Sequence, residues 1–199
     1  MLAVSFRAVK YRRSPFNSGI TRFHVSTPAM PPCIAHDLFE GILKNVLPRI
    51  MKYFILENEW FDLPTLNRRI RAFKCKGSDA LDPPKPYKSL DSLSGNAVQN
   101  WNHLRLLPFI IGDLIEDPDD EVWQVLLNLK EIVEYTTAPK ISMVQVAYLK
   151  HLIRSFIDSL KRLEGVFPKC LIPKVHFLCH YPDLIAVFGP LIRQFTQIR

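Results

Sequence analysis

The sequence predicts a mainly α-helical fold, and three observations lead to that prediction. Hydrophobic residues make up 48% of the 199 residues, which is enough to bury a core. Sixteen prolines accompany only seven glycines, whereas compact β proteins need glycine in their tight turns. Apolar residues recur every three or four positions in long segments that prolines separate, as expected for the amphipathic helices of a bundle.

The segment from Ile34 to Leu56 is expected to form a long amphipathic helix. Pro48 lies inside it and is expected to kink it or to split it in two, because proline removes one backbone hydrogen bond. A shorter helix is expected over Leu63 to Phe73, with Asp62 as its N-cap and Pro64 in its first turn.

Lys74 to Ser92 is rich in charge and proline and is expected to be an exposed loop that joins two helical halves. Ser94 is expected to open the next helix, which is bent at Pro108 and ends near Ile115. Three large aromatic side chains sit on apolar helix faces and are expected in the core: Trp101, Trp123 and Phe156.

Three more helices are expected in the second half of the chain. The acidic segment 117–120 ends one helix and caps the next, whose apolar face runs from Val122 to Tyr135. Long helical patterns follow at Met143 to Leu163 and Lys174 to Phe188. Ile192 to Ile198 is the one segment whose alternation would permit a strand.

The net charge of +7 is unevenly distributed along the chain. The first 32 residues contain five basic residues and no acidic residue: Arg7, Lys10, Arg12, Arg13 and Arg22. This leader could be a basic arm that touches nucleic acid, a mitochondrial presequence, or an unstructured extension left by an altered gene start. We expect residues 1–30 to be a poorly ordered leader and residues 31–199 to be a single helical domain.

The four cysteines lack the spacing of a disulfide framework, and no secretory signal precedes them, so a reducing compartment is expected. No apolar run reaches the roughly 18 residues that a membrane span needs, so no membrane partner is expected. No small-molecule substrate is evident, because the phosphate-binding, nucleophile-elbow and paired-histidine metalloprotease motifs are all missing.

Two groups of residues stand out instead. One is P-P-C-I-A-H-D-L-F-E-G at residues 31–41; the other is K-V-H-F-L-C-H-Y-P at residues 174–182, followed by F-G-P-L-I-R at residues 188–193.

These blocks resemble the conserved blocks of CACTA-like (En/Spm-type) transposases, eukaryotic DDE enzymes with an RNase H-type fold. Cys33 and His36 occupy the family's C-x2-H signature, which follows its second catalytic aspartate. Residues 180–182 and 188–191 are similar to a later block that leads into the catalytic glutamate, and residues 101–108 are similar to a weaker block. The resemblance covers residue 23 to the C-terminus. It implies a helical bundle that corresponds to the helical insertion of the transposase, with the flanking sheet largely missing.

Such enzymes hold two divalent metals with three carboxylates. No Asp or Glu precedes Asp37 in this sequence, and none follows Asp183. We therefore expect a truncated, catalytically inactive, transposase-derived remnant without a cofactor; Mg²⁺ would enter only if an intact triad existed elsewhere. Asp37 and Glu40 lie one turn apart and could imitate a metal pair, but acids in a first helical turn ordinarily complement the helix dipole.

The resemblance also implies DNA as a partner and the nucleus as the location. The basic, acid-free leader leaves mitochondria as the alternative location. Phosphate contacts are expected from the basic residues Arg12, Arg13, Arg68, Arg69, Arg71, Lys74 and Lys76, although a solvated basic face would look the same. The competing hypotheses are a helical structural or protein-interaction module without a nucleic-acid role and, less favoured, an active metal-dependent DNA-cleaving enzyme.

A less favoured metal site would be zinc held by two Cys-His pairs: Cys33, His36, His176 and Cys179. These four side chains could form a tetrahedral set if the two helix ends met. His180 and Tyr181 are expected to pack or to hydrogen-bond in the core.

Overall fold

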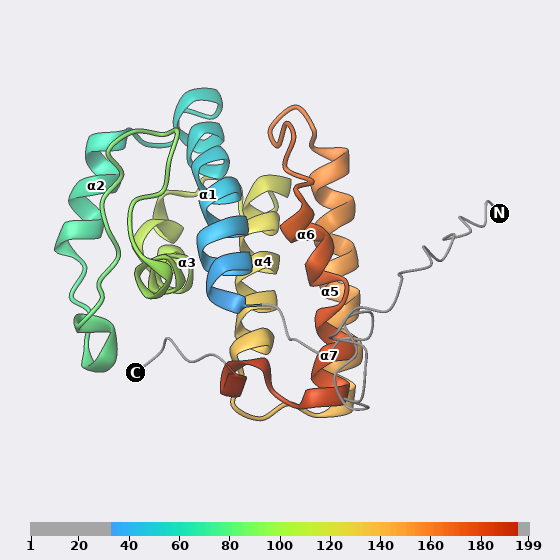
Figure 1. Ribbon diagram of the computed structural model, residues 1–199. Helices are drawn as coiled ribbons and strands as arrows, with labels where there is room; N and C mark the ends of the chain where they lie inside the picture. The colour runs from blue at the N-terminus through green and yellow to red at the C-terminus, as the bar shows by residue number, and fades with distance from the viewer. Residues whose placement is uncertain (1–32, 195–199) are drawn as a thin grey trace, which may run out of the picture. The chain divides into compact units, whose positions relative to one another are not determined.

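The computed structural model describes residues 33–194, and this part of the chain is mainly helical, as predicted (Figure 1). Within this range there is no β-strand, only an isolated bridge between Ser89 and Ser92. The leader with Arg12 and Arg13, and residues 195–199, lie outside the described range. The α-helices are α1 (Leu43–Lys52), α2 (Leu63–Ala72), α3 (Ala97–Ile111), α4 (Glu121–Thr137), α5 (Met143–Arg162), α6 (Pro173–Leu178) and α7 (Tyr181–Phe188).

The long first helix is continuous, so of the two outcomes expected at Pro48, a kink or a split, the split is wrong. A π-helix, η2 (Ala35–Ile42), runs directly into α1, and a second one, η3 (Tyr53–Glu57), follows α1. The Leu43 amide donates to the Leu38 carbonyl, five residues back, where η2 joins α1. The helix continues past Pro48 because its apolar face is fully buried, and that burial outweighs the one lost hydrogen bond.

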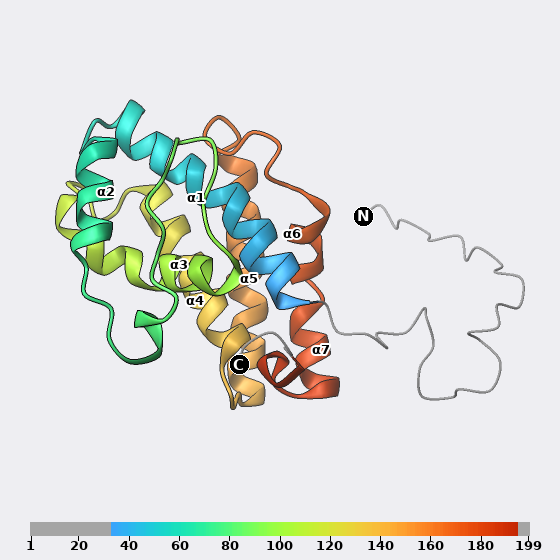
Figure 2. The ribbon, with the colours of Figure 1, turned by 60° about the vertical axis from the view of Figure 1, so that its left-hand side comes forward.

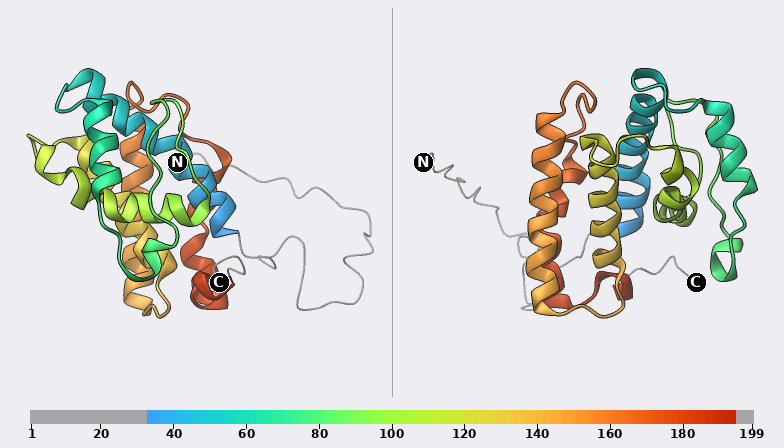
Figure 3. Two further views of the ribbon diagram at one scale, coloured as in Figure 1. Left: turned by 90° about the vertical axis from the view of Figure 1, so that its left-hand side faces the viewer. Right: turned by 180° about the vertical axis from the view of Figure 1, so that it is seen from behind.

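Helices α3, α4 and α6 pack against the first helix, and the other helices pack on these neighbours. Helices α4 and α5 form an antiparallel pair, and α1 packs against α3 and α4 (Figures 1 and 2). Helix α6 lies against η2, and α7 lies against α5. Helix α2 packs on α3 and occupies the edge of the bundle opposite α5 (Figure 3). One apolar core therefore connects both halves of the described chain.

The helix starts follow their capping chemistry. Asp62 accepts the Thr65 amide and caps α2, and Asp120 accepts two amides and caps α4, both as predicted. The prediction for Ser94 is wrong, because α3 begins at Ala97 and its N-cap is Asn96. Asn96 accepts the Gln99 amide while the Gln99 side chain accepts the Asn96 amide, so this reciprocal pair sets the start.

The last helical stretch divides into α6 and α7 at residues 179–180. Pro182 has no amide hydrogen to bond the Leu178 carbonyl, so the helix cannot continue regularly across this point. The strand that the alternation would permit over residues 192–198 does not form in the described part of that segment. Residues 191–194 form a 3₁₀ turn, η6 (Leu191–Gln194), after Gly189 has redirected the chain at a φ of 78°.

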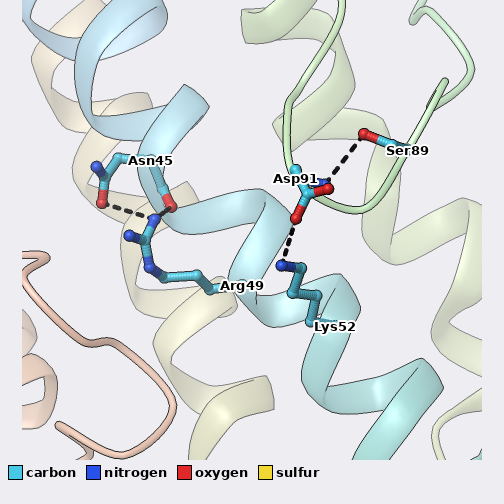
Figure 4. A network of polar contacts seen from close by, with 5 residues as sticks. All are labelled: Asn45, Arg49, Lys52, Ser89 and Asp91. Carbon is cyan, nitrogen blue, oxygen red and sulfur yellow. Dashed lines mark hydrogen bonds and ion pairs between the residues drawn. The ribbon is translucent and has the colours of Figure 1, made fainter.

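The loop between α2 and α3 is fastened to the bundle from two sides. Lys52 of α1 forms an ion pair of 2.5 Å with Asp91, beside the Arg49–Asn45 contact of the same helix (Figure 4). The Asn67 side chain of α2 forms two hydrogen bonds with the backbone of Tyr87. The loop contains the short turn η4 (Gly77–Ala80) and joins two helical halves, as predicted. It is not exposed throughout, contrary to the prediction, because Tyr87 is 3% exposed and packs against His103.

Two of the three predicted core aromatics are buried. Phe156 is fully inaccessible and Trp123 is 8% exposed, whereas Trp101 is half-buried and stacks on Phe39 with ring centroids 5.5 Å apart. A second 3₁₀ turn, η5 (Gly112–Leu114), follows α3. Within residues 33–194, no helix is both long and apolar enough to cross a membrane.

Candidate functional site

The two sequence blocks that stand out lie side by side in the fold, because η2 packs against α6. The Lys174 amine donates to the His36 carbonyl at 2.7 Å, which joins positions 138 residues apart in the chain. Gly41 allows this approach: a Cβ atom there would collide with the Lys174 side chain and lie 2.9 Å from the His36 carbonyl oxygen. Tertiary packing therefore connects the beginning and the end of the described chain.

A small polar cluster occupies this junction. The Cys33 thiol lies 3.0 Å from Nδ1 of His36, and both side chains are exposed. Burial raises the pKa of the half-buried Asp37 carboxyl, while the charges of Lys174 and His36 act in the opposite direction. Glu40 is half-buried as well. In residues 33–194 no three His, Cys, Asp or Glu side chains are placed to hold a metal ion, so Asp37 and Glu40 do not belong to such a set.

Tyr181 was expected in the core and is fully buried, but His180 beside it is exposed, contrary to the prediction. Burial raises the pKa of the Tyr181 phenol, and the nearby Asp37 and Cys33 add to that effect. The phenol oxygen has no hydrogen-bond partner among the described residues. The split between α6 and α7 explains the difference, because it places Tyr181 in a new helix that faces the bundle.

The four residues of the possible zinc site do not come together. Cys33 contacts His36, whereas His176 contacts His180, with 3.3 Å between their Nε2 atoms. Cys179 is exposed. No metal-holding group of three or more such side chains exists in the described part of the chain, so the zinc site predicted from these four residues is wrong.

The basic residues of α2 divide into two kinds. The Arg69 guanidinium donates a bidentate pair of hydrogen bonds to the Asp113 carboxylate oxygens, at 2.5 and 2.8 Å. It also donates to the Ile110 carbonyl. The Arg69 guanidinium holds the pKa of Asp113 below its usual value, mainly through these hydrogen bonds. Arg69 therefore fastens α2 to α3 and is a poor phosphate ligand, contrary to the prediction.

The remaining basic residues of this region face solvent. Arg68 and Arg71 lie one turn apart on α2, and each is exposed. Lys74 and Lys76 follow the helix and are exposed too, as are Lys85 and Lys88 of the loop. No ion pair of these six side chains is present in the described range. We call them the α2 basic surface: Arg68, Arg71, Lys74, Lys76, Lys85 and Lys88.

The α2 basic surface concentrates the positive charge of the described chain. Residues 62–90 contain seven basic and three acidic residues, a net charge of +4. The rest of the described chain, residues 33–61 and 91–194, contains 13 basic and 16 acidic residues, a net charge of −3. Sequence reasoning missed the two loop lysines, although a running charge count over the loop would have found them.

The chain matches no protein-family model, no curated protein and no solved structure.

Proposed function

We propose that this chain is a transposase-derived helical module that binds DNA and does not cut it. The proposal combines the resemblance of the blocks at residues 31–41 and 174–193 with the charge distribution of the fold. The observation that carries DNA binding is the α2 basic surface, where six exposed cations lack ion-pair partners within residues 33–194. Unpaired cations are the groups that replace counterions along a nucleic-acid backbone.

The proposed lack of cleavage depends on the carboxylate count. Two-metal cleavage needs three carboxylates in one place. Within the 199 residues, no acid precedes Asp37 and none follows Asp183. We infer that these 199 residues alone do not cleave DNA. Mg²⁺- or Mn²⁺-dependent nicking of a plasmid by the purified chain, lost in an Asp37→Ala variant, would overturn this inference.

DNA binding is testable through its salt dependence. The full chain is titrated with a fluorescent duplex at several salt concentrations, and the slope of log K against log salt counts the phosphate contacts. The triple variant Arg68→Ala, Arg71→Ala, Lys74→Ala should lower that slope by about three units, roughly one for each lost contact.

A matched control removes three cations from the opposite edge of the bundle: Lys150→Ala, Arg154→Ala and Lys161→Ala on α5. These side chains are exposed as well, and each triple variant removes three positive charges. Lys150 and Lys161 form exposed ion pairs with Asp183 and Asp158, unlike the cations of the α2 basic surface within residues 33–194. An equal loss in both triple variants would contradict a specific role of the α2 basic surface. A separate Arg12→Ala, Arg13→Ala variant measures the contribution of the leader.

A protein-interaction module is the second candidate, and exposed apolar residues favour it. Met143 and Val144 at the start of α5 are 66% and 80% exposed, and Val187 near the end of α7 is 66% exposed. Exposed apolar side chains that adjoin one another, as Met143 and Val144 do in the chain, are a common property of contact surfaces. Absence of DNA binding even at low salt would favour this second function.

A further inference from the structure

We propose that His176 and His180 form a binding site for a late first-row divalent cation, of the Ni²⁺, Cu²⁺ and Zn²⁺ class. Their Nε2 atoms lie 3.3 Å apart, and both rings are exposed to solvent. Two nitrogens on one tetrahedral ion, with metal–nitrogen bonds of about 2.0–2.1 Å, lie about 3.3 Å apart. The spacing of the two nitrogens therefore already equals that of a bound pair.

The backbone holds the two histidines in this relation. Their four-residue spacing places the two side chains on the same face of the chain, where α6 passes into α7. The Cys179 amide donates to the His176 carbonyl at 3.0 Å, and the His180 amide donates to the Phe177 carbonyl at 3.0 Å. The Leu184 amide in turn donates to the His180 carbonyl at 2.9 Å. These hydrogen bonds fix the backbone at both residues before binding, so the second imidazole is already close to an ion that the first one holds, which strengthens binding.

The ligand chemistry selects the class of metal. Imidazole nitrogens suit Ni²⁺, Cu²⁺ and Zn²⁺, whereas Mg²⁺ and Ca²⁺ need several oxygen ligands. In the described part of the chain no third His, Cys, Asp or Glu completes this pair. Water would occupy the remaining coordination positions, as it does in open metal sites. The site thus binds one ion through two protein ligands.

Calorimetric titration of the full 199-residue chain with NiCl₂ tests the proposal. The His180→Ala and His176→Ala variants should each bind Ni²⁺ about tenfold more weakly or worse, because one imidazole loses the chelate effect. Both side chains are exposed, so these variants should keep the fold, which far-ultraviolet circular dichroism verifies.

Three control variants separate this site from three other exposed side chains that could bind Ni²⁺. His151→Ala removes an exposed histidine of α5, His36→Ala removes the partner of Cys33, and Cys179→Ser removes the thiol between the two histidines. All three should keep the Ni²⁺ affinity of the unmodified chain within twofold. The proposal is overturned if His180→Ala retains that affinity, or if any control loses as much affinity as His180→Ala.

Discussion

The interface between α4 and α5 and the interface between α3 and the α2–α3 loop differ in what they bury. The first interface consists of apolar contacts between fully inaccessible side chains. They are Leu126 and Leu129 of α4 and Leu149 and Phe156 of α5. The second interface buries His103 of α3, whose ring contacts the Tyr87 ring of the loop edge-on, with centroids 5.2 Å apart. Neither ring nitrogen has a hydrogen-bond partner within residues 33–194. The first interface should make stability only weakly dependent on pH, because its Glu121–Arg162 ion pair is exposed, whereas the second should make stability sensitive to acid.

The largest expected effect is at the apolar interface. Phe156→Ala should lower the free energy of unfolding by about 3–5 kcal/mol, because it removes a fully buried ring and leaves a cavity. Urea denaturation at pH 7 and again at pH 5 measures the loss, which should be similar at both values. Val144→Ala, at a position that is 80% exposed, should change the same quantity by no more than about 0.5 kcal/mol.

The next largest effect should come from His103. Burial lowers its pKa from 6.5 to about 4 in the folded protein. Between these two values the unfolded chain binds a proton that the folded chain does not, so stability is full above about pH 6.5 and falls toward pH 4. The total loss from this histidine is about 3 kcal/mol.

Replacement of this histidine isolates its contribution. His103→Leu keeps the position apolar and removes the titrating group, so the difference in stability between pH 7 and pH 4.5 should shrink relative to the unmodified chain. The free energy of unfolding is plotted against pH for both proteins. Parallel curves across that range would contradict the prediction that His103 is buried and neutral in the folded protein, and would remove the proposed contrast between the interfaces.

A smaller effect is expected at the start of α4, where the N-cap residue also contacts Tyr53 of η3. Asp120 caps α4 by accepting two backbone amides, and it also accepts the Tyr53 hydroxyl at 2.9 Å. Asp120→Ala should cost about 1–2 kcal/mol of unfolding free energy. The neighbouring Asp119→Ala serves as the control, since Asp119 is exposed and is not the N-cap. Thermal or urea unfolding of both variants should separate them clearly.

The smallest effect on stability should belong to the residues of the DNA-binding proposal. Arg68→Ala and Arg71→Ala should each change the free energy of unfolding by less than about 0.5 kcal/mol, because both side chains are exposed. A larger loss in urea denaturation would mean that these arginines support the fold, and their effect on DNA affinity would then be indirect.

Sequence reasoning located the helices better than it located the functional residues. The long first helix, the Asp62 and Asp120 caps and the burial of Phe156 all followed from local patterns. Arg69 and Arg68 are adjacent and look equivalent in sequence. Only Arg69 meets Asp113, which comes from a turn 44 residues away. No local pattern can distinguish an arginine that is held in this way from one that remains exposed.

The sequence by itself determined the helical class, most helix boundaries and the uneven distribution of charge, because these depend on spacing and composition within short segments. Tertiary structure decided the rest. It brought the Lys174 amine to the His36 carbonyl, buried Tyr181 and exposed His180. Those outcomes depend on how one helix packs against another, and the pairing of distant surfaces is a property of the folded core, not of any one segment.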